Sequence, residues 1–165
     1  MPIEFDIKLE SKDMYRFNMY QMYSGFHGIF SIVIAVLAFA MAVMTYGEVT
    51  MTYTLIYSLF GVLFLIYMPV TLWMRSKHSL AASEVLKNTL HYQMDEEGVH
   101  VSQGEDSALL PWNQIYRMTA TKHNVLIYSS RTVAYVVPKS QIGDAYPKMA
   151  ELANRKLEKY RVKMK

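Results

Sequence analysis

Residues 26–46 read FHGIFSIVIAVLAFAMAVMTY, and residues 53–74 read YTLIYSLFGVLFLIYMPVTLWM. Neither stretch contains Lys, Arg, Asp or Glu, whereas soluble domains have about one charged residue in four. At about 1.5 Å per helical residue, each stretch is long enough to cross the roughly 30 Å hydrocarbon layer of a bilayer. The alternative is a buried helix of a soluble core, but such helices rarely have more than about 14 uninterrupted apolar residues. The sequence therefore predicts two transmembrane helices.

The connection between these stretches and the charges on their flanks predict the topology. Residues 47–50 read GEVT, a loop so short that the two helices must be antiparallel neighbours. The loop has no Lys or Arg, whereas basic residues flank the other ends of the two helices, at Arg16, Arg75, Lys77 and Lys87. By the positive-inside rule both chain termini are cytoplasmic. We expect a multi-pass protein of the cytoplasmic (inner) membrane, in which residues 11–78 form a transmembrane hairpin.

Small side chains recur along the first span at spacings of four, three and four. They share one helical face, where a partner backbone can approach closely; they are Ser31, Ala35, Ala38 and Ala42. Ser58 and Gly61 lie on the expected partner face of the second span. The pattern predicts helix packing at these positions, and the same face is a candidate surface for association with another membrane protein or a second copy of the chain.

Residues 3–9 read IEFDIKL and alternate strictly between apolar and polar side chains, which is typical of a half-buried strand. A strand on its own would leave its backbone unpaired. Because both termini are expected on one side of the membrane, our hypothesis is that residues 1–10 join the sheet of the domain that follows the hairpin. Ser11 is the expected N-cap of a helix that runs unbroken into the first span.

The region 87–165 predicts a cytoplasmic domain of short strands followed by one helix. Runs rich in strand-forming residues alternate with turn residues, and the expected strands are 89–94, 99–103, 108–110, 115–121, 125–128 and 132–137. With the N-terminal strand they make seven. Asp144 is the expected cap of the last helix, in which apolar side chains recur every three or four residues from Tyr146 to Met164.

The same region resembles a known family. Its segments HYQMDEEGVHVSQGEDSALLPWNQIYRM, from residue 91, and NVLIYSSRTVAYVVPKSQI, from residue 124, are similar to the YcxB-like family of bacterial membrane proteins. The resemblance implies two transmembrane helices before a pleckstrin-homology-like (PH-like) domain of seven strands closed by a C-terminal helix. The expected fold class is thus a membrane α+β protein: a two-helix transmembrane hairpin plus a cytoplasmic PH-like seven-stranded β domain closed by a C-terminal helix. The resemblance implies no catalytic residues.

Catalytic motifs are missing from the sequence. It contains no cysteine, which excludes thiol nucleophiles and Cys-ligated zinc. It has no Gly-rich phosphate loop, no HExxH and no GxSxG motif. His91 and His100 fall on neighbouring expected strands, but a shared metal would require further ligands that we do not identify. We therefore expect no enzyme activity, no metal and no cofactor.

The end of the chain is strongly basic. Six basic side chains are opposed by Glu158 alone, namely Arg155, Lys156, Lys159, Arg161, Lys163 and Lys165. Such a run is usually a solvated face. Near an anionic bilayer, however, each basic side chain gains about 1 kcal/mol. The sequence leaves both interpretations of these six residues open, a solvated surface or contact with anionic lipid.

Two classes of function follow from these features. The first is a membrane-anchored binding module that presents its domain to a protein or an anionic lipid. The second is a small structural subunit of a larger membrane complex, or a homo-oligomer, held together by the small-residue face. An enzyme is the least favoured class. The lipid bilayer is an expected partner, whereas nucleic acid is not, because the sheet shows no aromatic and basic face of the kind that stacks bases.

Overall fold

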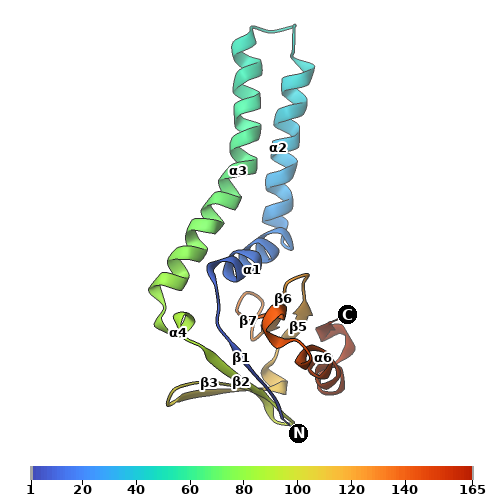
Figure 1. Ribbon diagram of the computed structural model, residues 1–165. Helices are drawn as coiled ribbons and strands as arrows, with labels where there is room; N and C mark the ends of the chain where they lie inside the picture. Colours follow the sequence, from blue (N-terminus) through green and yellow to red (C-terminus); the bar gives the residue numbers. More distant parts are fainter. Residues whose placement is uncertain (1, 165) are drawn as a thin grey trace. The chain divides into compact units, whose positions relative to one another are not determined.

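The computed structural model describes residues 2–164, apart from the side chain of His27 (Figure 1). The chain divides into two compact units. The helical unit contains residues 18–76, and the β unit contains the residues up to Phe17 together with those from Lys77 onward. The α+β class expected from the sequence is confirmed, because the structure combines helices with two sheets.

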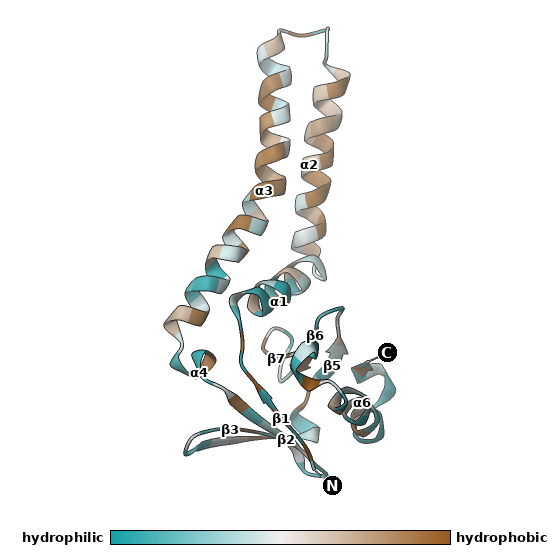
Figure 2. Cartoon of the chain, viewed as in Figure 1, coloured by the Kyte–Doolittle hydropathy of each residue, from teal (hydrophilic) through white to brown (hydrophobic). Residues whose placement is uncertain are grey.

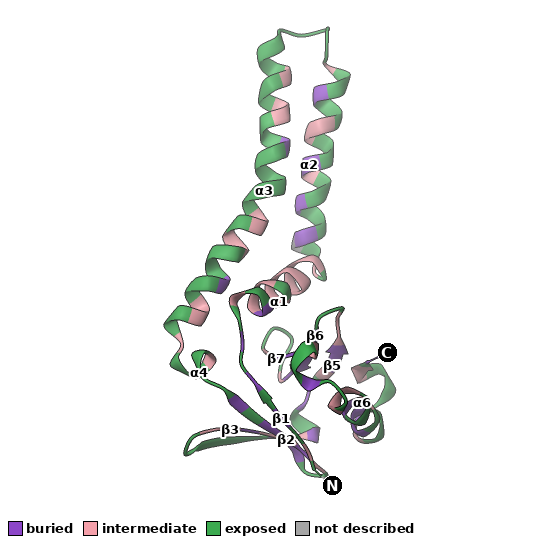
Figure 3. Ribbon diagram, in the orientation of Figure 1, coloured by how far each residue is buried: buried purple, intermediate pink, exposed green. Residues whose placement is uncertain are grey.

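The helical unit is built on long apolar helices. Its elements are the end of α1 (Ser11–Tyr23), all of α2 (Phe26–Met44) and most of α3 (Met51–Ala82). Figure 2 shows hydrophobic residues along α2 and α3, and Figure 3 shows that most of these positions are exposed. Large apolar side chains such as Phe30, Val36 and Phe60 are more than half exposed. Contiguous apolar surface of this extent is unfavourable in water and is typical of a helix that contacts membrane or protein.

Among the helices that the structure describes, α3 by itself is long and apolar enough to cross a membrane, and only 6% of its most apolar window is buried. The α1 and α2 helices pass the same test only when taken together, and they are bent by 74°. Among the described residues there is thus one candidate spanning helix, or there are two if the bent pair forms one broken span. The hairpin of two complete spans stays a prediction.

The expectation that α1 runs unbroken into α2 is wrong. The helix ends at Tyr23, and Gly25 is extended, with φ −104° and ψ 166°, before α2 begins. A side chain at Gly28 could not be accommodated, because its Cβ would lie 2.9 Å from the Cα of Tyr23. The first turn of α2 therefore folds back against the end of α1, which only glycine permits there.

The small-residue face is the buried side of α2. Ser31, Ala35 and Ala42 are buried, and Ala38 is half-buried. On α3, Gly61 is buried and lies against the ring of Phe39, which follows Ala38. The partner position Ser58 is half-buried, and its hydroxyl donates to the Thr54 carbonyl of its own helix at 2.8 Å.

The β unit contains two four-stranded sheets, with strand orders β1-β2-β3-β4 and β7-β6-β5-β8. The first sheet consists of β1 (Ile3–Ile7), β2 (Leu90–Met94), β3 (Gly98–Gln103) and β4 (Asp106–Pro111). The second consists of β5 (Arg117–Ala120), β6 (Asn124–Tyr128), β7 (Ala134–Pro138) and β8 (Val162–Lys163). Short helical elements are α4 (Glu84–Lys87), η1 (Trp112–Gln114), α5 (Lys139–Ile142), α6 (Ala145–Lys156) and η2 (Lys159–Arg161). Every pairing is antiparallel except the parallel one between β5 and β8.

The N-terminal strand β1 lies beside β2, with Ile3 opposite Met94 and Ile7 opposite Leu90. The ring of Phe5 stacks on that of Tyr92, with centroids 5.5 Å apart. Ile7 is fully buried. Segments from before and after the helical unit therefore build one sheet, and the helical unit is inserted between them in the sequence.

Two expectations about the end of the chain are wrong. The described residues form eight strands rather than seven, because the last helix, α6, ends at Lys156 and the chain returns as β8. Leu157 is extended, with φ −112° and ψ 150°, and the following segment pairs with β5, which a longer helix could not do. Asp144 makes no capping hydrogen bond, because its own backbone is already helical, with φ −68° and ψ −11°.

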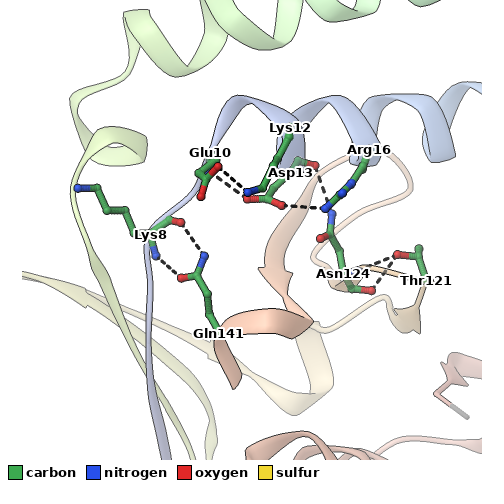
Figure 4. A network of polar contacts seen from close by, with 8 residues as sticks. All are labelled: Lys8, Glu10, Lys12, Asp13, Arg16, Thr121, Asn124 and Gln141. Carbon is green, nitrogen blue, oxygen red and sulfur yellow. Dashed lines mark hydrogen bonds and ion pairs between the residues drawn. The ribbon is translucent and has the colours of Figure 1, made fainter. Parts of the chain in front are cut away.

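A buried polar network ties the start of α1 to the second sheet (Figure 4). Asp13 accepts from the backbone N–H of Glu10 at 3.2 Å, so the N-cap position is Glu10 rather than the expected Ser11. The Nδ2 of Asn124, on β6, donates to the backbone carbonyl of Asp13 at 3.2 Å. Asp13 and Asn124 are both almost fully buried. This contact fixes α1 to β6 within the β unit.

A second contact fixes the chain just before α1. The side-chain amide of Gln141, on α5, accepts from the Lys8 backbone N–H at 2.8 Å and donates to the Lys8 carbonyl at 2.9 Å (Figure 4). The Gln141 amide thus bonds both the N–H and the carbonyl of one backbone residue, as a neighbouring strand would. The segment between β1 and α1 is thus held to the helices that follow β7.

Replacing Asn124 with alanine is expected to lower the free energy of unfolding of the β unit by about 1–3 kcal/mol, because the buried Asp13 carbonyl loses its side-chain donor. Thermal unfolding of the full chain in detergent would measure this change. Asn154→Ala is the matched control, since the exposed Asn154 amide donates to the Ala150 carbonyl of its own helix. Equal unfolding midpoints for the two variants would show that the Asn124 contact contributes nothing.

Candidate functional site

The basic residues of the tail lie in different surroundings. Arg155 and Lys156, in the last turn of α6, both form ion pairs with Glu96. Lys159 is exposed on η2. Arg161 and Lys163, on η2 and β8, line a pocket. Lys165 lies outside the described residues. Contact between these side chains and lipid stays a prediction.

The pocket at the end of the tail has a volume of about 480 Å³, and we call it the basic pocket. Its lining consists of Tyr116, Arg117, Tyr160, Arg161 and Lys163. Three of these five side chains are cationic, two carry a phenol, and none is acidic. The size falls within the usual range of small-molecule sites, roughly 300–1,000 Å³.

The backbone brings the pocket residues together through the parallel pairing of β5 and β8. Met118 is opposite Val162, and Thr119 is opposite Lys163. The residues just before these pairs are Arg117 on β5 and Arg161 at the end of η2. Positions separated by more than 40 residues therefore become neighbours only because the tail adds a strand to the sheet.

Arg161 is held in place by backbone carbonyls. Its Nε donates to the carbonyl of Tyr116 at 3.0 Å, and its Nη2 donates to the carbonyl of Ile115. The Tyr116 backbone is itself fixed, because its N–H donates to the Tyr128 carbonyl at 2.7 Å. Carbonyl groups satisfy hydrogen bonds without neutralising the guanidinium charge. Arginine has five N–H donors, so Arg161 keeps donors for a further acceptor.

Arg117 is held by an aromatic ring. Its guanidinium carbon lies 4.2 Å from the ring centroid of Tyr128, which is fully buried on β6. The Nε of Arg117 is buried and has no hydrogen-bond partner among the described residues. A cation fixed over a buried ring has lost part of its hydration, which makes its charge more available to an anion.

The three cations of the basic pocket lack acidic partners. None of the ion pairs formed within residues 2–164 includes Arg117, Arg161 or Lys163. The nearest acid in the sequence, Glu158, is engaged by a phenol. A hydrogen bond to the Glu158 carboxylate, together with its negative charge, raises the pKa of the Tyr160 hydroxyl. The pocket therefore concentrates positive charge that no described acidic side chain compensates through an ion pair.

A second cavity, of about 600 Å³, lies between the start of β1, the turn after β2, and α6. It contrasts with the basic pocket, because its charges are mixed and partly paired. Its lining residues are Pro2, Ile3, Asp95, Glu96, Glu97, Lys148, Glu151, Leu152 and Arg155. A hydrogen bond from Lys156 lowers the pKa of the Glu96 carboxyl, and the Arg155 and Lys156 charges lower it further. Four of its lining side chains are acidic and two are basic, so the cavity is net negative and, unlike the basic pocket, does not favour an anion.

Asp95 stabilises the turn between β2 and β3. Its Oδ1 accepts from the backbone N–H groups of Glu97, at 2.9 Å, and Gly98, at 3.2 Å. Partial burial raises the pKa of the Asp95 carboxyl, but these hydrogen bonds and the nearby His100 lower it by more, so it lies below its ordinary value. The indole of Trp112 donates to the Asp95 carbonyl at 2.9 Å. Asp95 and Trp112 therefore support the fold of this turn.

The histidines of the first sheet are separated. His91 Nδ1 lies 2.7 Å from Asp6, and His100 Nε2 lies 3.0 Å from Asp95. His91 is opposite Ser102 and His100 is opposite Gln93, so the two rings do not face each other. In the part of the chain that the structure describes, no group of three or more His, Asp or Glu side chains is arranged to hold a metal.

Sequence reasoning identified the basic tail but missed Tyr116 and Arg117. These two residues follow the Pro111–Trp112 corner and show no motif of their own. A signal did exist: Val162 is a β-branched residue inside the expected helix, and it favours a strand there. Without the β5–β8 pairing, however, nothing in the sequence connects Arg117 with Arg161.

Comparison with known proteins identifies a relationship for one part of the chain. Residues 95–153 match the family model described as YcxB-like protein. This segment runs from the turn after β2 into α6, and it stops before the tail. No curated protein and no solved structure matches the chain. The resemblance to the YcxB-like family is confirmed over these residues.

Proposed function

Starting from a chain that carries a YcxB-like segment at residues 95–153, we propose that the protein is a membrane-anchored binding module. In this proposal α2 and α3 form a transmembrane hairpin, and the β unit is displayed in the cytoplasm to bind a ligand. The domain is of the PH-like type that the family resemblance implies, and the protein is bacterial. It has no catalytic activity of its own.

The proposal of membrane anchoring rests on the exposure of apolar side chains along α2 and α3. The spanning window of α3 is only 6% buried, whereas the core helix of a soluble protein is mostly buried. The α2 helix has 19 residues without an Asp, Glu, Lys or Arg, which is about 28 Å at 1.5 Å per residue. In water both helices would expose side chains that gain free energy only in an apolar environment.

The construction of the β unit supports the proposed topology. Its sheet contains β1 from before the apolar helices and β2 from after them. Both flanks must therefore lie in one compartment. An even number of membrane crossings satisfies this requirement, and two crossings are the smallest number that does. The basic flanks, Arg16 and Arg75 among them, favour the cytoplasm as that compartment.

The binding part of the proposal rests on the basic pocket, which presents three cations that form no ion pair with a described residue, beside the β5–β8 pairing. The alternative, a structural subunit held by the small-residue face, receives less support. Ser31, Ala35 and Ala42 are already buried within the helical unit, so they are not exposed for another protein. Association with another membrane protein would have to use the exposed sides of α2 and α3.

Single-cysteine labelling tests the proposed topology sharply, because the natural chain has no cysteine. Two exposed positions are compared in intact cells of a bacterial host: Glu48→Cys in the loop between α2 and α3, and Ser107→Cys on β4. A membrane-impermeant maleimide is expected to label Glu48→Cys in intact cells and Ser107→Cys only after lysis. Labelling of both positions, or of neither, before lysis would reject the hairpin. Release of the protein by carbonate without detergent would reject membrane anchoring altogether.

A further inference from the structure

We propose that the basic pocket is a binding site for a phosphate monoester, carried by an anionic lipid headgroup or by a small phosphorylated metabolite. This inference rests on the proposed binding function and specifies its ligand. The pocket is formed by Tyr116, Arg117, Tyr160, Arg161 and Lys163. Arg155, Lys156 and Lys159, the other basic residues of the tail that the structure describes, do not line it.

The charge of the basic pocket selects the ligand class. Arg117, Arg161 and Lys163 together carry three positive charges, and none of them forms an ion pair with a described residue. A phosphate monoester carries about −1.5 to −2 charges near pH 7 and three strong acceptor oxygens. A carboxylate offers a single charge and two oxygens. The phosphate therefore compensates the cluster more completely.

The geometry of the two arginines suits an oxyanion. The Arg161 guanidinium is fixed by the carbonyls of Ile115 and Tyr116, and the Arg117 guanidinium is fixed over the Tyr128 ring. Planar guanidinium groups recognise phosphate oxygens with paired N–H donors. Because both side chains are already placed, binding costs little side-chain entropy. The buried Nε of Arg117 has no hydrogen-bond partner among the described residues.

The rest of the pocket accommodates the group that carries the phosphate. A volume of about 480 Å³ exceeds what a phosphate alone requires and leaves room for a glycerol or a sugar. Tyr116 and Tyr160 line the same space, and both are exposed. Phenol rings contact apolar and sugar surfaces, while their hydroxyl groups donate hydrogen bonds. The chemistry of the pocket is thus that of a small phosphorylated molecule.

The paired basic residues provide an internal comparison. Arg155 and Lys156 belong to the same tail and carry the same charges as Arg161 and Lys163. Their charges are compensated by Glu96, so they attract an additional anion less strongly. A simple basic surface would use all of these side chains alike. A specific binding site would use only the basic side chains that line the pocket.

The test measures binding to the full-length chain in a non-ionic detergent. Calorimetric titration with glycerol 3-phosphate and with dihexanoyl phosphatidic acid, which share one headgroup, separates the two sources of the phosphate. Dihexanoyl phosphatidylcholine is the zwitterionic control. Equal affinity for the first two probes would assign a soluble phosphate ligand, and tighter binding of phosphatidic acid would assign a lipid; either result supports the site. Failure of both to bind at millimolar concentration and low salt would overturn it.

Matched variants assign any binding to the pocket. Arg117→Gln and Lys163→Gln are each expected to weaken binding about tenfold, because each removes a charge-assisted contact. Arg155→Gln and Lys156→Gln, with the same changes of charge, are expected to stay within about twofold of the natural chain. Equal losses in the two sets would overturn the proposal. Arg117→Gln could unfold the domain by releasing Tyr128. Lys163 is exposed, so Lys163→Gln leaves the fold intact and tests the contribution of the pocket to binding by itself.

Two further readouts test the charges of the site and of the ligand. Glu158→Gln removes the negative charge beside Tyr160 and is expected to strengthen binding about twofold. Lowering the pH from 7.5 to 5 is expected to weaken binding, because the ligand loses charge near pH 6 while the Lys and Arg side chains keep theirs. Stronger binding at pH 5 would contradict the phosphate assignment. These results do not depend on the cysteine labelling, so failure of the pocket and failure of the topology are distinguishable.

Discussion

Deleting residues 2–10 is expected to unfold the β unit of the full-length chain. The deletion removes β1, and with it three buried apolar side chains, Phe5, Ile7 and Leu9. Full burial of such a side chain contributes about 1.5–3 kcal/mol. Three of them together are comparable to the whole stability of a typical domain, about 5–15 kcal/mol. The deletion also removes the five pairings between β1 and β2.

Hydrogen exchange of the β2 amides in detergent-solubilised full-length protein measures this effect directly. Protection of Leu90–Met94 is expected to collapse in the deletion variant. Ile7→Asp is the single-residue version, because it places a charge at a fully buried position. Glu4→Ser is the matched control on the exposed face of the same strand. If β2 remains as protected after the deletion as in the natural chain, β1 does not support the domain.

Replacing Gly98 with alanine is expected to lower the free energy of unfolding by about 1–3 kcal/mol, the usual cost of forcing extra atoms into a packed site. Gly98 begins β3 and is opposite Pro111 on β4. An added Cβ would collide with the backbone carbonyl of Leu110 and would lie 2.9 Å from the Cα of Pro111. Backbone atoms cannot move aside as a flexible side chain can. The hairpin from β3 to β4 would have to separate.

The control for Gly98→Ala is Gly104→Asn, in the turn between β3 and β4. Gly104 has φ +60°, a conformation that asparagine tolerates, and a Cβ there would meet no atom within 4 Å. Its thermal midpoint is expected to stay near that of the natural chain. Near-ultraviolet circular dichroism of Trp112, which donates to the turn before Gly98, reports on the same region. A Gly98→Ala midpoint no lower than that of Gly104→Asn would contradict the steric argument.

Local patterns predicted most of the strands. The six strands expected after the apolar stretches correspond to β2 through β7, with ends that differ by up to about two residues. The alternation of residues 3–9 predicted the strand that the structure has as β1. These predictions succeeded because alternating burial is a property of a few neighbouring side chains, which the sequence displays directly.

The error about the last helix was caused by contact between distant residues. Apolar periodicity extended the last helix to Met164, because Leu157 and Met164 fit a helical stripe. In the structure both side chains are buried, but in a tail that leaves the helix at Leu157, passes through η2 and then pairs with β5. The missed break between α1 and α2 has a local cause instead, because Gly28 lies against Met22 and Tyr23 in the preceding turn.

The sequence by itself determined that this chain has two long uncharged stretches, a strand at its start, a series of strands after the stretches, and a basic end. All of these are properties of side chains close together in the sequence, where charge, hydropathy and periodicity act locally. Only the tertiary structure decided that β8 lies beside β5, that Asn124 binds the Asp13 carbonyl, and that Arg117 joins Arg161 and Lys163 in one pocket. Those arrangements depend on contacts between segments that are far apart in the sequence. The residues around each contact position do not indicate which distant residue it will meet.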